Sequence, residues 1–280
     1  MQFSNLLLIL GLLMWPLSRH TEGLTTEVNH DPGVELCSTT NQAFKHGERV
    51  VYKIYYNWNF VWLSAGEVSF TARENEDDIL IEVIGKTYKS YEWFFKVDDY
   101  YSTRMRKSDL LPVEFIRDVK EGNYTQYNKI LFDQTKGKAK SWKGKSKKDL
   151  SYNEYDLGGC MHDMLSMIYF LRNADISGIS EGDAFPISIF MGSRTYDLSV
   201  TYKGDELSKK VKGSGKYDLM HFSPEVLAGT QFSEGTVMDV YVTKDKNKVP
   251  VLVESPVSVG AVKAVLIEHK GLRHPLTSKK

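Results

Sequence analysis

The chain has 280 residues, of which 41% are hydrophobic and 12% aromatic, so it can form one large β domain or two small ones with a substantial core. Lysine plus arginine and aspartate plus glutamate each number 36, which leaves no net charge at pH 7. We therefore expect neither nucleic acid nor an anionic membrane surface to attract the chain through bulk charge.

The N-terminus has the pattern of a signal peptide. Residues 6–17 are an apolar run that Gly11 and Pro16 interrupt, which is too short to span a bilayer. An uncleaved anchor is the alternative, because no lysine or arginine precedes this run and no clean Ala-x-Ala cleavage site follows it. We expect residues 1–22 to be the signal peptide and residues 23–43 to be an extended arm or linker. The mature chain should be exported and should contain no transmembrane segment.

The two cysteines are Cys37 and Cys160. In an oxidising compartment an even number of cysteines favours a disulfide, which would join the arm to the region before the predicted helix. Two unrelated thiols are the alternative.

From residue 44 onward, short runs rich in β-branched and aromatic residues alternate with turn signals, as in antiparallel sheets. Residues 136–148 contain seven lysines and predict a solvated hairpin that protects a sheet edge. A patch for phosphate or an acidic polymer is the alternative reading of these lysines. The other expected strands are residues 49–58, 61–70, 79–85, 97–104, 113–119, 124–132, 184–191, 194–203, 207–212, 215–222, 236–243, 249–259 and 260–269.

Residues 161–173 predict one main helix among these strands. Apolar residues such as Met161, Leu165 and Ile168 recur at spacings of three and four. Because the apolar surface of this helix is broad, we expect it to lie in or across a β-sheet.

Two charged residues flank the apolar part of this helix. Asp163 lies in the first turn and Arg172 near the other end, where their charges suit the helix dipole. We expect Arg172 to reach a strand carboxylate, and a ligand anion is the alternative partner. The carboxylates considered are Asp98, Asp99 and Asp118.

These elements predict a mainly β fold, an antiparallel barrel or half-barrel of about fourteen strands around one main helix. Residues 44–270 should form this single domain, and residues 271–280 should be a disordered tail.

Several segments resemble the DUF3108 family of exported bacterial proteins of unknown function. They include Phe44-x-x-Gly47-Glu48-x-x-x-Tyr52, Ala65-Gly66, residues 97–102, the helix at 163–172 and the strands at 244–266. The resemblance covers about residues 44–270 and implies a β-rich barrel-like fold in the periplasm of a Gram-negative bacterium. It carries over no activity and no binding residues.

No catalytic constellation or cofactor motif stands out. Cys160 and His162 would diverge on a helix, so we do not expect a thiol dyad. Few histidines and carboxylates could converge as metal ligands, and no phosphate-binding glycine loop precedes a helix. We expect no cofactor and no metal.

The expected function is a non-catalytic periplasmic binding or carrier domain. A curved sheet around a helix favours a concave site for a lipid, an acyl chain or a saccharide. Ordinary core packing is the alternative reading of the aromatic residues. Two other functions compete: an assembly factor that binds another envelope protein through sheet edges, and a hydrolase of envelope polymers. The residues expected to line the site are Tyr56, Trp58, Trp62, Trp93, Phe94, Tyr169 and Arg172.

Overall fold

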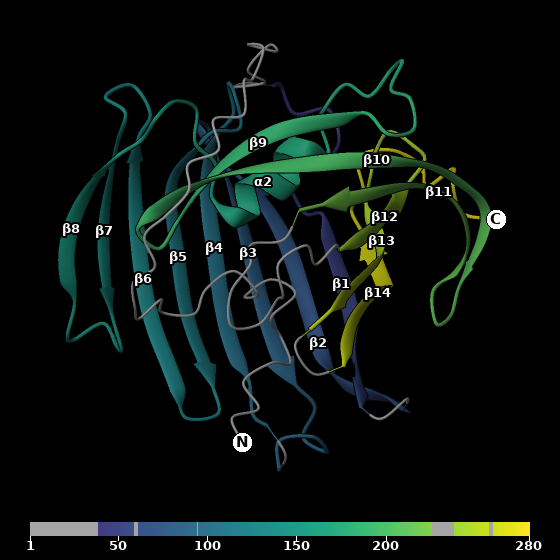
Figure 1. The fold of residues 1–280 in the computed structure, drawn as a ribbon, viewed down its shortest axis with the longest axis horizontal. Helices are drawn as coiled ribbons and strands as arrows, with labels where there is room; N and C mark the ends of the chain where they lie inside the picture. Colours follow the sequence, from purple (N-terminus) through teal and green to yellow (C-terminus); the bar gives the residue numbers. More distant parts are fainter. Residues whose placement is uncertain (1–38, 59–60, 94, 226–237, 258–259) are drawn as a thin grey trace, which may run out of the picture.

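One antiparallel sheet of fourteen strands curls around a helix in the computed structural model (Figure 1). The structure describes residues 39–58, 61–93, 95–225, 238–257 and 260–280. This arrangement confirms the predicted mainly β fold around one main helix.

The first half of the sheet is a meander in which each strand pairs with the next, from β1 to β8. Alternating buried and exposed residues along β3 and β5 show one face on the core and one in solvent. The strands are β1 (Arg49–Trp58), β2 (Val61–Glu74), β3 (Asp78–Thr87), β4 (Asp98–Arg106), β5 (Pro112–Glu121), β6 (Tyr124–Asp133), β7 (Lys138–Gly144) and β8 (Ser151–Asp156).

The chain then passes through the helix to the opposite edge of the sheet. From β9 it returns strand by strand until β14 pairs with β1, so that the sheet order runs from β8 through β1 and β14 to β9. These elements are α2 (Met164–Leu171), β9 (Ala184–Met191), β10 (Arg194–Val211), β11 (Gly215–Pro224), β12 (Asp239–Thr243), β13 (Pro250–Pro256) and β14 (Ala261–Lys270).

The two edge strands, β8 and β9, do not form a ladder with each other in the described residues. Instead, β9 crosses over the first half of the sheet (Figure 1) and makes aromatic contacts there. Phe190 lies 6.1 Å from Phe132 of β6 and 5.4 Å from Tyr155 of β8, between ring centroids. The sheet is therefore an open half-barrel held together at its edges by side chains.

Helix α2 is shorter than the predicted range of 161–173. Asp163 is its N-cap and accepts hydrogen bonds from the amides of Leu165 (2.7 Å) and Ser166 (3.0 Å). His162 instead pairs with β9, since its amide donates to Ser188 and its carbonyl accepts from Phe190. This long-range pairing holds residues 161 and 162 out of the helix. No helix in the described residues has the length and apolar character needed to cross a bilayer.

Two local predictions are wrong. Residues 194–203 and 207–212 were expected as separate strands, but β10 runs through both, because Gly204 produces a register shift with φ of +97° instead of a turn. The expected disordered tail at 271–280 is also ordered. The carbonyl of Ser278 accepts from Asp218 (2.8 Å), and the amide of Lys280 donates to Lys216 (2.8 Å). The tail thus forms backbone hydrogen bonds with β11. The polar sequence of the tail gives no sign of this pairing.

Candidate functional site

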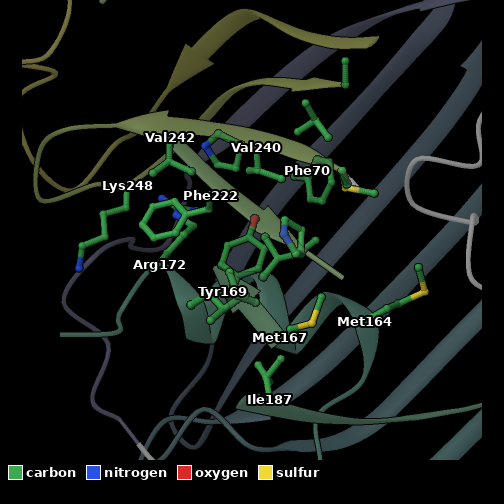
Figure 2. Close-up of a pocket in the computed structure, with 18 of the residues that line it drawn as sticks. Phe70, Met164, Met167, Tyr169, Arg172, Ile187, Phe222, Val240, Val242 and Lys248 are labelled. Atoms are coloured by element: carbon green, nitrogen blue, oxygen red, sulfur yellow. The ribbon is translucent and has the colours of Figure 1, made fainter. Parts of the chain in front are cut away.

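A cavity of about 230 Å³ lies between α2 and the inner faces of β1, β2 and strands β9–β14 (Figure 2). Its lining is apolar except for a few polar groups, and Arg172, Glu225 and Lys248 are its three charged residues. The other lining residues are Val50, Tyr52, Ile54, Val68, Phe70, Met164, Met167, Ile168, Tyr169, Leu171, Ile176, Phe185, Ile187, Leu198, Val200, Phe222, Pro224, Met238, Val240, Val242, Pro250, Val253 and Ala264.

Two sequence periods produce this lining. Val50, Tyr52 and Ile54 alternate along β1, so that they share one face of the strand. On α2, Met164 and Met167 belong to a stripe at helical spacing that turns toward the cavity (Figure 2). Methionine side chains are unbranched and flexible, so this wall can adapt to ligands of different shape.

A buried ion pair closes one end of the cavity. The guanidinium of Arg172 donates to both carboxylate oxygens of Glu48, at 2.6 and 2.9 Å, and its Nε donates to the carbonyl of Asn247 at 3.0 Å. The side chains of Arg172 and Glu48 are 5% and 1% exposed. Phe44 and Tyr169 pack against the guanidinium.

The partner of Arg172 is thus Glu48, and the expectation of Asp98, Asp99 or Asp118 is wrong. Burial opposes the charge of Arg172, but the attraction of Glu48 outweighs it, so the pKa of Arg172 is raised. Glu48 and Asn247 engage three of the five N–H donors of Arg172, so the contacts seen at this residue are structural.

The other predicted site residues do not gather at this cavity. Tyr169 lines it, whereas Tyr56 is buried in the main core outside the lining. Trp62 and Trp93 are 38% and 84% exposed. The side chain of Trp58 and all of Phe94 lie outside the described part of the chain. Cys37 also lies outside it, so the disulfide to Cys160 stays a prediction. Thiol titration of the unreduced chain can test it.

Sequence reasoning missed the strand residues that face α2 across the cavity, such as Phe70 of β2, Phe222 of β11 and Val240 of β12. Their alternation marks an inward face, but only the pairing of β14 with β1 decides that this face meets α2.

A second hollow, of about 490 Å³, adjoins the apolar cavity and shares Arg172, Ile176 and Lys248 with it. Its remaining lining includes the exposed Lys244 and Lys246. Lys248 donates from Nζ to the carbonyl of Ala174 at 2.7 Å, and burial lowers its pKa.

A separate polar cluster lies on the inner face of β4–β6. Arg117 is directly opposite Tyr101 on one side and Asn128 on the other, and Asp99 and Glu121 are buried nearby. Burial, followed by the neighbouring carboxyl of Glu121, raises the pKa of Asp99 to about 9, and burial raises the pKa of Glu121. Both carboxyls have almost no solvent access, which weighs against hydrolysis of a polymer at this cluster.

The described residues contain no group of three or more His, Cys, Asp or Glu side chains that could hold a metal ion. His162 is the buried imidazole closest to Cys160 in sequence, and burial lowers its pKa to about 4. Its Nδ1 lies 3.3 Å from Oγ of Ser166, so this ring forms part of the packing before α2.

Comparisons with known proteins agree with this fold. The family model DUF3108, described as a protein of unknown function, matches residues 51–267. A β-barrel-like protein of domain of unknown function DUF1849 from Brucella abortus is similar in structure, with a TM-score of 0.53 and 10% identity over 81% of this chain and 99% of that one. At this identity the similarity concerns the fold alone. No curated protein matches the chain.

Proposed function

The chain belongs to the DUF3108 family, whose function is unknown, and we propose from the apolar cavity that it binds or carries a hydrophobic ligand without catalysis. The predicted signal peptide supports the further proposal that the ligand is bound outside the cytoplasm, in the periplasm of a Gram-negative cell. The proposed ligand is then a lipid or an acyl chain of the envelope.

The size and chemistry of the cavity support this proposal. Apolar cavities of about 150 Å³ stay dry and take up benzene, and this cavity is larger, at about 230 Å³. A hydrocarbon ligand in this space would bury its apolar surface against apolar side chains, which is favourable.

The same lining favours hydrocarbon over saccharide, the other ligand class expected from the sequence. A saccharide needs hydrogen-bonding partners for its hydroxyl groups, because a buried hydroxyl without a partner costs free energy. The cavity offers mostly aliphatic and aromatic side chains.

Binding of another envelope protein through a sheet edge remains the second candidate. Strand β8 is almost wholly exposed, and Tyr152 on it is a large exposed aromatic residue. Charged Glu154 and Asp156 on the same short strand oppose indiscriminate pairing, so this candidate requires a partner with complementary charge.

Thermal unfolding in the presence of hexanol, decanol and tetradecanol tests the carrier function. Binding should raise Tm saturably with alcohol concentration, because the ligand stabilises only the folded state. Val200→Phe, which fills the cavity from β10, should abolish this rise. Thr201→Phe, on the opposite face of the same strand, should keep it. A Tm that responds to no alcohol, or equally in both variants, would contradict the proposal.

A further inference from the structure

The apolar cavity ends at a basic region. The second hollow begins at the residues it shares with the cavity and continues along the turn between β12 and β13, past Lys244 and Lys246 to His274 of the C-terminal tail. A ligand whose chain fills the cavity therefore meets basic side chains at this end.

Most charges around this end already have partners. Arg172 is paired with Glu48, and Lys244 with Asp205. The carboxylate of Asp245 accepts from the hydroxyl of Thr243 (2.9 Å) and the amide of Asn247 (3.0 Å), which holds it within its own turn. These three groups leave little free charge for a ligand, and Lys246 is exposed to solvent, where its charge is screened.

Lys248 differs from them because the described residues place no carboxylate within ion-pair distance of its ammonium group. The charge of Asp175 acts against the lowering of the Lys248 pKa, but Asp175 is exposed and its carboxylate accepts from the amide of Ser177 at 2.9 Å. Glu225, the acidic residue of the cavity lining, is engaged by the amide of Ser199 at 3.0 Å. An ammonium group has three donors, and Lys248 uses one, on the carbonyl of Ala174. A half-buried positive charge is thus left with unused donors where the two hollows meet.

The backbone at Lys248 provides an independent observation. Its φ is +45°, in the left-handed region that glycine and asparagine adopt more easily than lysine. The amide of Lys248 donates to the carbonyl of Asp245 at 3.2 Å, so this conformation belongs to the turn and sets the direction of the side chain. Buried Asn247 fixes the turn, since its side chain accepts from the amide of His274 at 2.9 Å and donates to the carbonyl of that residue at 3.1 Å.

We propose that the ligand is a single-chain amphiphile with an anionic head, whose alkyl chain occupies the apolar cavity and whose carboxylate or phosphate oxygens bind Lys248 in the second hollow. This inference rests on the proposed carrier function and adds the class of ligand. In Figure 2 Lys248 lies at the edge of the labelled residues with its side chain directed away from their centre, as a contact with a head group outside the cavity requires.

Calorimetric titration of the full chain with dodecanoic acid, dodecyl phosphate and dodecanol tests this inference. One or both anionic ligands should bind roughly tenfold to a hundredfold tighter than dodecanol, which is the range for hydrogen bonds to a charged group. Lys248→Gln should remove that preference and leave dodecanol binding unchanged. Lys120→Gln, at an exposed lysine of β5, should keep the preference.

A second variant, Lys248→Gly, guards against misfolding because glycine relieves the positive φ while removing the ammonium group. It should behave as Lys248→Gln does. Equal affinity for acid, phosphate and alcohol, or an equal loss for all three in the variants, would overturn the inference and leave the carrier function standing. Binding of acetate or inorganic phosphate as tightly as the long-chain compounds would also overturn it. Failure of all three long-chain ligands to bind would instead reject the carrier function itself.

Discussion

The ion pair between Glu48 and Arg172 should be one of the largest single contributions to the stability of this protein. Glu48→Gln keeps the shape of the side chain but removes the negative charge from a guanidinium that is 5% exposed. Removing one partner of a buried pair typically costs about 3–5 kcal/mol, because the remaining charge stays buried without compensation. The stability of an ordinary domain is about 5–15 kcal/mol, so the variant should lose a large fraction of it.

A neighbouring pair offers a matched control. Arg49 and Glu268 also lie 2.6 Å apart, but their side chains are 33% and 54% exposed. Glu268→Gln should therefore cost less than about 1 kcal/mol. Urea unfolding at pH 7 and low salt measures both losses as changes in the free energy of unfolding.

The double variant Glu48→Gln/Arg172→Met separates loss of the pair from loss of packing. It should recover part of the stability lost in Glu48→Gln, because no charge is then left buried alone. A loss in Glu48→Gln no larger than that in Glu268→Gln would refute this account of the pair. A double variant less stable than the single one would show that the contacts of Arg172 with Phe44 and Tyr169 matter more than its charge.

Two further predictions concern the helix and the buried carboxyls. Leu165→Ala should lower the free energy of unfolding by about 2–5 kcal/mol, because Leu165 is fully buried. Ile168→Ala should lower it by less, because Ile168 already borders a cavity. Equal losses for the two variants in urea unfolding would contradict this difference. Asp99 binds its proton more tightly in the folded chain, with a pKa of about 9 against 3.8, so its contribution is full below pH 4 and is lost as pH rises toward 9. The urea midpoint should fall as pH rises over this range, and it should fall less in Asp99→Asn. An equal fall in the variant would show that other groups cause the pH dependence.

The fold could be predicted from the sequence because its signals are local. The alternation along the strands and the apolar spacing around Leu165 each lie within one segment of the sequence. They can therefore be recognised without knowing which segments pack against them. The predicted start of the helix at residue 161 is too early, because His162 pairs with β9 and Asp163 is the N-cap. The ordered tail depends likewise on a distant strand, β11.

The candidate site was only partly predictable, for a related reason. Tyr169 and Arg172 could be found because they lie on the helix that forms one wall. The partner of Arg172, Glu48, is 124 residues away in sequence, and nothing local connects them. The tryptophans were poor guides because an aromatic residue in a β protein also packs on the outer surface. Trp62 does so, with the ammonium group of Lys263 4.4 Å from its ring centre.

The cavity follows from the mismatch between a wide sheet and a short helix. Helix α2 has eight residues and is roughly 12 Å long, at 1.5 Å per residue. It packs against β4 and β9, and the aromatic contacts of Phe190 fill the space beside it in the first half of the sheet. The cavity lies where α2 faces β1, β2 and strands β9–β14. Because β8 and β9 share no ladder, widening the half-barrel to admit a ligand would separate side chains at the edges and break no hydrogen bonds between those two strands.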